Sequence, residues 1–416
     1  MKNFYFGGML GCMLLSGQVF SLSAQEAKIG DVAYSTLADA FVAANEGDKI
    51  VVSKDLDVDI MIPVTRSVTL DLNGKTITNN VPNNRLFRLS DVTFTIDGND
   101  GSVITPEGNT TSYGFIDFRD AAGNAGSSTT LIVSNANFKG ATNEGSLFAF
   151  RGASGQSLQF DNVNVELTGG YTYSIINGYH MNVDIKLNGG KYVCNSTHQT
   201  AGVFQAGPGS VVDFNGVTVE TSVGPIFEAV ANKATFTDCT MTNTATNSFF
   251  AACIAASNGA DVTVDGGTYT ANYPLYVYNS GGTVNVDGGE FNGKIAAIQV
   301  DNREGADYES KVSVTNGTFN GPLVVDNRSE LAISGGVYTD KNAENYCTDG
   351  FKLEANADGT YGVVPDSGSA TGVEDIVIEG EKDSTVYNLN GVKVGDSVNG
   401  LTPGIYVVNG KKLLVK

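Results

Sequence analysis

The sequence has few of the residues on which catalytic and nucleic-acid-binding sites most often depend. Its 416 residues include no Trp, two His, and 25 Lys or Arg against 45 Asp or Glu, a formal net charge of −20. Nucleic acids need a basic face, so we expect no nucleic-acid partner. The chain also has no phosphate loop, dinucleotide fingerprint or G-x-S-x-G elbow. We expect no cofactor, apart from the calcium ion considered below.

Cysteine is scarce, and its spacing does not indicate a function. Four cysteines follow the first 25 residues, and none forms a C-x-x-C pair or matches a metal-binding or disulfide framework. Buried free thiols and one incidental disulfide are both compatible with this spacing. The four residues are Cys194, Cys239, Cys253 and Cys347.

Long apolar runs are missing beyond the N-terminus. Residues 1–25 carry Lys2, an apolar stretch that extends to Phe20, and small residues up to Ala24, which is the pattern of a secretory signal peptide. No later segment is apolar over the length that a bilayer requires. We therefore expect a mature protein without a membrane span, either secreted or held at the outer cell surface.

Glycine is abundant, with 51 residues, and one phrase recurs. "VTVDGGTY" (262–269) returns as "VNVDGGEF" (284–291), and its general form is apolar-x-apolar-polar-x-x-x-apolar. Only Gly101 breaks the rule that the residue four positions after the polar one is apolar or aromatic. The polar position falls at Asn73, Asp97, Ser134, Asp161, Asn188, Asn215, Thr237, Asp265, Asp287, Thr315 and Ser334.

Repeats of 20 to 30 residues with strand-type alternation are typical of a solenoid, in which no single repeat buries its own core. We predict an all-β parallel β-helix of about eleven coils, stacked about 4.8 Å apart. Polar side chains at equivalent turns then lie above one another and can bond the next coil. A second strand recurs within most coils, as in "FIDFRD", "LFAFRG" and "PLYVYN".

The N-terminal part resembles a known superfamily. "YSTLADAFVAAN" predicts a capping helix that begins after Ser35. Together, "ADAFVAANEGDKIVV" and the following "VTLDLNGKTIT" resemble the opening of the pectin-lyase-like right-handed parallel β-helix superfamily. The likeness covers about 32–340 and implies a right-handed solenoid. We divide this part into an N-terminal helical cap (26–66), the β-helix (67–340) and a C-terminal cap (341–364).

The C-terminal part is predicted to be separate from the rod. A linker rich in Pro, Gly and Ser (365–381) precedes a small β module (382–416), whose Asn409-Gly410 predicts a two-residue hairpin turn. Three segments of the module, 388–391, 404–407 and 411–412, resemble the sorting domain of type IX secretion substrates in Bacteroidetes. The resemblance implies that secretion machinery is a partner. The alternative is a β module that merely ends the chain.

Candidate catalytic and binding residues fall on the second strand. Asp117, Arg119, Arg151 and Glu228 are expected in its outward column. Arg119 and Arg151 on neighbouring coils could hold a uronate or a sulfate; alternatively, Arg119 pairs with Asp117 or Asp120 on a solvated face. Glu228 is expected three coils from Asp117, roughly 14 Å, whereas glycoside hydrolysis requires carboxyls about 5–10 Å apart.

Two further groups have both a functional and a structural interpretation. Tyr276 and Tyr278 could stack on sugar rings, or could pack against their own sheet. Asp55, Asp57 and Asp59 alternate along one strand face and could bind Ca²⁺. A charged edge strand that resists aggregation explains the three carboxylates equally well.

The function that this pattern favours is an exported, non-catalytic scaffold. We expect an adhesin-like or glycan-contacting β-helix, because the repeat is long and the catalytic motifs are missing. One alternative is a polysaccharide lyase or glycoside hydrolase acting on an acidic polysaccharide. Another is a structural component of a surface layer. A fold of this kind does not decide between them.

Overall fold

The structure is a computed structural model, and it describes the parts of the chain that form the rod and the C-terminal module. Residues 1–24 of the predicted signal peptide, most of the predicted linker and the Asn409-Gly410 turn lie outside the described residues. Among the described residues, no helix is long and apolar enough to cross a membrane. The described residues are 25–106, 108–109, 112–142, 145–169, 172–196, 202–246, 251–366, 385–408 and 411–415.

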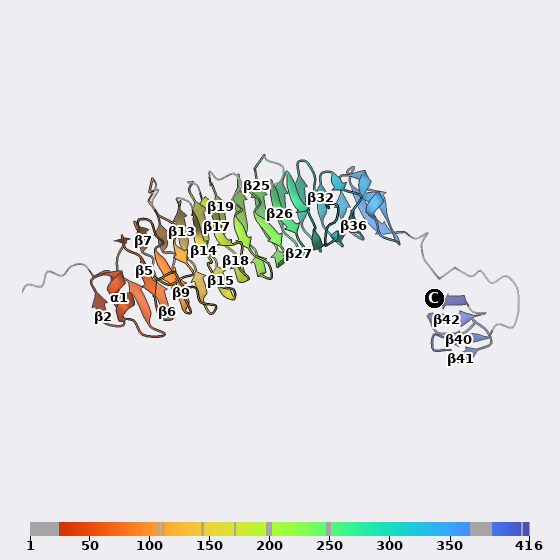
Figure 1. Ribbon diagram of the computed structural model, residues 1–416. Helices are drawn as coiled ribbons and strands as arrows, with labels where there is room; N and C mark the ends of the chain where they lie inside the picture. The colour runs from red at the N-terminus through yellow and green to blue at the C-terminus, as the bar shows by residue number, and fades with distance from the viewer. Residues whose placement is uncertain are drawn as a thin grey trace, which may run out of the picture.

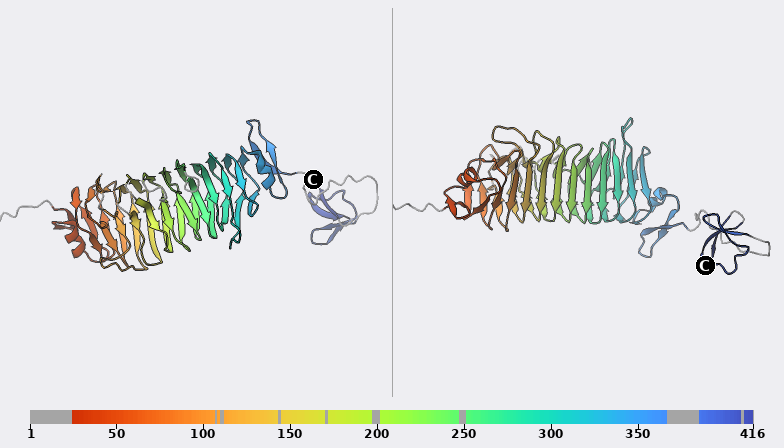
Figure 2. Two further views of the ribbon diagram at one scale, coloured as in Figure 1. Left: turned by 45° about the horizontal axis from the view of Figure 1, so that its top comes forward. Right: turned by 90° about the horizontal axis from the view of Figure 1, so that it is seen from below.

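Three long sheets extend side by side along a rod (Figures 1 and 2). The parallel strands of sheet A are β3 (Lys49–Val52), β6 (Val68–Asp71), β9 (Thr93–Asp97), β12 (Thr130–Ser134), β15 (Gln156–Asp161), β18 (Val183–Asn188), β21 (Val211–Asn215), β24 (Lys233–Thr237), β27 (Ala260–Asp265), β30 (Gly282–Val286), β33 (Ser310–Val314) and β36 (Ser329–Ile333).

Sheet B follows sheet A in each coil. Its parallel strands are β4 (Leu56–Val58), β7 (Thr76–Asn79), β10 (Ser102–Ile104), β13 (Asn137–Gly140), β16 (Asn164–Leu167), β19 (Lys191–Cys194), β22 (Thr218–Thr221), β25 (Thr240–Asn243), β28 (Thr268–Ala271), β31 (Glu290–Gly293), β34 (Thr318–Asn320) and β37 (Val337–Tyr338).

Sheet C completes each coil. Its strands are β5 (Ile62–Val64), β8 (Phe87–Leu89), β11 (Ile116–Asp117), β14 (Gly145–Ala149), β17 (Thr172–Gly178), β20 (Phe204–Ala206), β23 (Phe227–Val230), β26 (Ala252–Ser257), β29 (Tyr273–Val277), β32 (Ile298–Val300) and β35 (Leu323–Val325). The chain visits the three sheets in turn and pairs each strand with its counterpart in the next coil. The predicted all-β parallel β-helix is therefore confirmed.

The repeated phrase covers the end of an A strand, a turn and the start of a B strand. Its final apolar residues pair directly with one another along sheet B and are buried, as in the stacked rings of Tyr269, Phe291, Phe319 and Tyr338. Successive ring centroids in this stack are 5.0, 5.0 and 4.9 Å apart. The phrase repeats because each coil places its apolar or aromatic side chain on that of its neighbour.

The first two turns of the repeat differ from the prediction. Asp71, not Asn73, pairs with Asp97 in sheet A, and Val103, not Gly101, occupies the apolar position beside Ile77 in sheet B. The connections β6–β7 and β9–β10 each hold two more residues than the following turn, β12–β13. This insertion explains why Gly101 broke the sequence rule.

The A-to-B turns restrict residue type through their backbone. The first turn residue has a positive φ in successive coils, and Asn, Asp or Gly occupies it, as at Asn135, Asn162, Gly216 and Asp238. The Asn162 amide donates to the Asn135 side-chain oxygen at 3.1 Å. The predicted bonding of turn side chains between coils is therefore present.

A short helix covers the N-terminal end. Strands β1 (Ala27–Ile29) and β2 (Val32–Tyr34) extend sheet A antiparallel, and α1 (Leu37–Ala43) follows. The N-cap is Thr36 rather than Ser35, because the Thr36 hydroxyl accepts from the Asp39 amide at 3.0 Å. Phe41 is buried against Phe87 and Phe94, with centroids 5.6 and 5.8 Å apart. The helix thus closes the core.

At the other end, η1 (Lys341–Tyr346) and the antiparallel strands β38 (Phe351–Ala355) and β39 (Tyr361–Pro365) follow the last coil, and β39 pairs with β37. The C-terminal module is a separate antiparallel sheet. Its strands are β40 (Val386–Asn388), β41 (Lys393–Gly395), β42 (Gly404–Val408) and β43 (Lys411–Val415). Strands β42 and β43 form the predicted hairpin.

Candidate functional site

The connections around sheet C vary far more than those between sheets A and B. The longest connection from sheet B to sheet C covers 105–115, and the longest from sheet C to sheet A covers 118–129. Both flank β11, which has only two residues, Ile116 and Asp117. Functional residues tend to concentrate in variable loops held by a regular scaffold. We therefore expect the candidate site on this face.

Asp117 lies at the centre of a group of arginines. The Nε and Nη2 atoms of Arg119 donate to the two carboxylate oxygens of Asp117, at 3.1 and 2.8 Å. Arg88 Nε and Arg85 Nη1 lie 3.8 and 4.0 Å from Asp117 Oδ2. The Asp117 side chain is 1% exposed and that of Arg85 is 3% exposed. One buried carboxylate is therefore shared by three guanidinium groups.

The strands bring these residues together although they are distant in sequence. Arg88 pairs with Asp117 in the outward column of sheet C. Arg85 precedes β8, and its Nη2 donates to the Ser146 carbonyl at 3.0 Å, 61 residues away. Burial lowers the pKa of Arg85 to about 10. The attraction of Asp117 opposes this decrease, and repulsion from the neighbouring arginines adds to it. The hydrogen bonds to Asp117 raise the pKa of Arg119.

Arg119 and Arg151 lie on neighbouring coils, as the sequence predicts. Asp117 pairs with Ala149, and each arginine follows two residues later. Phe118 and Phe150 directly precede the two arginines, and their ring centroids lie 4.2 Å apart. Arg151 is exposed, whereas Arg119 is engaged by Asp117, which is the alternative that the sequence left open.

Glu228 lies in the same outward column as Asp117 but farther away than predicted. The column passes from β11 through β14, β17 and β20 to β23. The separation is therefore four strand spacings, roughly 19 Å, rather than three. The two carboxylates are too distant for the paired chemistry of glycoside hydrolysis.

A second group of side chains surrounds Glu228 and the two predicted tyrosines. The hydroxyl of Tyr278 donates a short hydrogen bond to Glu228 Oε1, and that of Tyr276 donates to Asp301 Oδ2 at 3.0 Å. Burial raises the pKa of Glu228, and the bond from Tyr278 offsets part of this effect. Burial likewise raises the pKa values of both tyrosines. These hydroxyls remain protonated donors at neutral pH.

The tyrosines lie on a small apolar cluster outside the main core. Tyr276 is 5.5 Å from Tyr273 and 5.3 Å from Tyr278 between ring centroids. Ala255 occupies the outward column position between Glu228 and Tyr276, whereas Cys253, two residues earlier, is buried in the main core. The other buried members of the cluster are Ala245, Ala251, Ala252 and Ala296.

The predicted calcium ligands line the edge of sheet B. Strand β4 is the outermost strand of that sheet, and Asp55, Asp57 and Asp59 are exposed. Asp55 accepts from the Thr76 amide at 2.8 Å, and Asp57 accepts from the Asn80 side chain at 3.4 Å. Among the described residues, no group of three His, Cys, Asp or Glu side chains is arranged to hold a metal ion.

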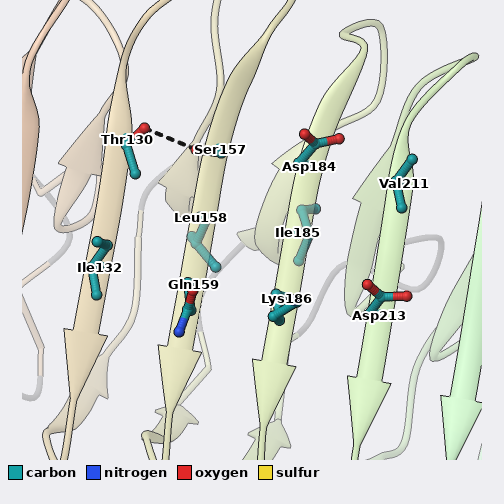
Figure 3. Close-up of a pocket in the computed structure, with 10 residues that line it drawn as sticks. All are labelled: Thr130, Ile132, Ser157, Leu158, Gln159, Asp184, Ile185, Lys186, Val211 and Asp213. Atoms are coloured by element: carbon teal, nitrogen blue, oxygen red, sulfur yellow. Dashed lines mark hydrogen bonds between the residues drawn. The ribbon is translucent and has the colours of Figure 1, made fainter.

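The outer faces of sheets A and B carry shallow depressions. Figure 3 shows one of these depressions, about 340 Å³, over β12, β15, β18 and β21. Its side chains follow the strands in parallel rows, and Thr130 bonds Ser157 at 2.9 Å. On sheet B, Lys139 pairs with Glu166 at 3.0 Å. These charges are compensated by a neighbour one coil away, and no polar groups converge on a point.

All four cysteines that follow the predicted signal peptide are free thiols. Cys194, Cys239 and Cys253 are buried, and burial raises the pKa of each thiol. The predicted alternative of buried free thiols therefore holds for these three cysteines. Cys347 is also a free thiol, but it is only partly buried. A raised pKa lowers the thiolate fraction, which makes such thiols poorly reactive.

Sequence reasoning missed Arg85 and Arg88. Arg88 could have been found, because "LFRL" (86–89) has the same alternation as "FIDF" one coil later. Extending the second-strand column one coil toward the N-terminus places Arg88 beside Asp117. Arg85 lies outside that strand, and nothing in its local pattern indicates that a distant coil buries it.

The fold defines the class of protein as a parallel β-helix solenoid with a separate C-terminal β module. No known protein family, curated protein or solved structure matches the chain. The candidate functional residues lie on the outer face of sheet C.

Proposed function

We propose that the chain is an exported β-helix that contacts glycans without catalysis, as an adhesin-like scaffold at the cell surface or outside the cell. The observation that carries this proposal is the tyrosine group of Tyr273, Tyr276 and Tyr278 on the outer face of sheet C. Tyr276 and Tyr278 are partly buried rings with fixed hydroxyls, and Tyr273 packs beneath them as a buried ring. Such rings suit a sugar, because its ring faces are apolar and its edges carry hydroxyl groups.

The hydrogen bonds of the tyrosines support a binding role. Asp301 and Glu228 accept from Tyr276 and Tyr278, so the rings are held in defined orientations before a ligand arrives. Pre-ordered side chains lose little rotamer entropy on binding, which favours affinity. Gln205 and Gln299 lie in the same outward column and are partly exposed. Their amides add donors and acceptors for sugar hydroxyls.

The alternative of a polysaccharide lyase or glycoside hydrolase receives less support. Asp117 is buried and accepts two hydrogen bonds from Arg119, and Glu228 lies roughly four strand spacings away. Neither carboxylate is placed to act as a pair with the other.

The remaining parts of the proposal come from the sequence. They are the signal peptide at 1–25, the right-handed sense of the solenoid and its kinship with the pectin-lyase-like superfamily. They also include the sorting function of the tail, a partner in the type IX secretion machinery and a Bacteroidetes origin. The exposed apolar side chains of the tail, such as Leu389 (59%) and Val392 (58%), are compatible with a partner surface.

A glycan array with the mature protein tests the proposal. We expect retention on a defined set of glycans, and we expect Tyr276→Ala to weaken that binding by at least about tenfold, as for a central aromatic contact. The matched control is Tyr387→Ala, which removes a 39% exposed tyrosine from the C-terminal module. Equal binding by both variants would count against the tyrosine group as the contact.

The same protein distinguishes the alternatives. Turnover of an acidic polysaccharide that Arg151→Ala abolishes would establish the enzyme alternative. Ordered self-assembly without a glycan ligand would instead favour the surface-layer alternative. Binding to the array without turnover or assembly is the expected result.

A further inference from the structure

Among the residues that the structure describes, the arginine group around Asp117 is not balanced in charge. Arg85, Arg88 and Arg119 all lie within 4.0 Å of the single Asp117 carboxylate, and Arg151 lies one coil away from Arg119. The next carboxylate along the chain, Asp120, is occupied by the backbone and side-chain amides of Asn124, at 2.7 and 2.9 Å. The group therefore has a local positive excess within a chain of net charge −20.

Burial makes this excess costly. A buried charge is tolerated when opposite charges and hydrogen bonds satisfy it. The Nε atoms of Arg85 and Arg88 are buried and have no hydrogen-bond partner among the described residues. Arg88 Nη1 reaches only two backbone carbonyls, at 3.5 and 3.4 Å. The described part of the chain therefore leaves donors here without a partner.

The position within the fold also indicates a built site. The two longest connections around sheet C flank Asp117, and Arg88 donates to Asp120 and Ala121 in the second of them. Exposure then rises along the group, from 3% at Arg85 to 18% at Arg88 and 31% at Arg119. Beyond them, Arg151 is exposed. The charges thus extend from the interior to the solvent.

We propose that Arg88, Arg119 and Arg151 bind a compact tetrahedral oxyanion of the sulfate type, supported from below by Arg85 and Asp117. The three guanidinium groups come from successive coils. They therefore present donors at three successive levels along the rod. A tetrahedral oxyanion presents acceptor oxygens in several directions, whereas a carboxylate presents two in one plane. This site is independent of the tyrosine group.

Two sources could supply this chemistry, a free ion or a sulfate ester on a sugar. We would titrate the full chain with inorganic sulfate by isothermal calorimetry at low ionic strength, with chloride at matched ionic strength as the reference. We expect saturable binding to sulfate that added salt weakens. A parallel titration uses a sulfated oligosaccharide and its desulfated form. Stronger binding of the sulfated form than of free sulfate would assign the site to sugar-borne sulfate.

Two variants and one control make the test specific. Arg151→Gln lies outside the contacts with Asp117, so the fold around that carboxylate should be retained. We expect about a tenfold loss of sulfate affinity, because one charge-assisted hydrogen bond contributes about 1.5 kcal/mol or more. Arg119→Gln should weaken binding similarly, with circular dichroism confirming that it folds.

The matched control is Arg328→Gln, because Arg328 pairs with a single carboxylate, Asp326, at 3.7 Å. Its sulfate affinity should equal that of the unaltered chain. The proposal is wrong if the unaltered chain shows no saturable sulfate binding. It is also wrong if Arg151→Gln and Arg328→Gln change the affinity equally.

Discussion

The outer faces of sheets B and C differ in how their charged side chains are paired and buried. On sheet B, Lys139 pairs with Glu166 and Lys191 pairs with Glu220, at 3.0 and 2.7 Å, each across one coil spacing. These pairs are about half exposed and balanced one to one. On sheet C, the side chain of Asp117 is 1% exposed, and three arginines lie within 4.0 Å of its single carboxylate.

The connections show the same contrast. Turns between sheets A and B are short and place equivalent residues above one another, so that side of the rod is determined by stacking. Connections on either side of sheet C range from one residue, at Asn272, to the long segments around β11. Sheets A and B therefore form the regular scaffold, whereas sheet C is the face whose connections vary most in length from coil to coil. Four predictions test this division, in order of decreasing effect.

The largest loss of stability is expected from the interior stack of sheet B. Phe291→Ala removes a fully buried ring that lies between Tyr269 and Phe319. We expect a loss of about 3–5 kcal/mol in the free energy of unfolding, from lost transfer energy and the cavity that remains. Chemical denaturation measures it. Val324→Ala, at a 41% exposed position on sheet C, should change stability by less than about 0.5 kcal/mol.

The second prediction compares the two kinds of charge. Asp117→Asn keeps the shape of the side chain but leaves the buried Arg85 and its neighbours without a counter-charge. Removing one partner of a buried ion pair costs about 3 kcal/mol. Glu166→Gln on sheet B should cost about 1 kcal/mol or less, because exposed pairs contribute little. Similar losses in thermal unfolding for both variants would contradict the contrast between the sheets.

The sequence was sufficient for the fold because stacking copies a local pattern from coil to coil. The alternation of "VTVD" places Val262 and Val264 inside, and the register repeats this in the next coil at Val284 and Val286. The error at Asn73 arose because the sequence rule assumed equal turn lengths. A two-residue insertion preserves side-chain direction but shifts the phrase.

The candidate site was less predictable, because it depends on contacts between coils whose loops differ. Register along sheet C brings Arg88 beside Asp117, and this follows from the repeat once the strand is recognised. The burial of Arg85 depends on the carbonyl of Ser146, which no local pattern indicates. The tyrosine group was predicted in part, but the contact of Tyr278 with Glu228 spans 50 residues and two coils.

The third prediction concerns the A-to-B turns. Gly267 has φ +91°, and a Cβ atom there would lie 2.3 Å from the Cys239 carbonyl oxygen of the preceding coil. Gly267→Ala should therefore cost about 2–3 kcal/mol, from backbone strain and steric overlap. Gly216→Ala is the control, because Gly216 has φ +61° but open space around its Cα. It should cost about 1 kcal/mol. Equal shifts in the denaturation midpoint would show that coil contact is unimportant.

The smallest effect is expected at Glu228 and depends on pH. Burial raises the pKa of Glu228, so in the folded state this carboxyl holds its proton to a higher pH than in the unfolded chain, where the pKa is about 4.3. Its contribution is most favourable below that value and is lost as pH rises through the raised pKa. Glu228→Gln removes the titration and keeps an acceptor for Tyr278. We expect it to raise the unfolding temperature at pH 7, with a gain of about 1 kcal/mol or less in the free energy of unfolding.

The difference between Glu228→Gln and the unaltered chain should shrink when calorimetry is repeated near pH 4, since most of the Glu228 carboxyl is then protonated in both states. Glu220→Gln is the matched control, because Glu220 is an exposed glutamate on sheet B that pairs with Lys191 at 2.7 Å. Its side chain is about half exposed, so relief of burial is small and the substitution should give no gain there. A gain for Glu228→Gln that stayed constant across this pH range would show that desolvation of the carboxylate is not its cause. It would also remove the distinction between the buried charges of sheet C and the solvated charges of sheet B in the middle of the rod.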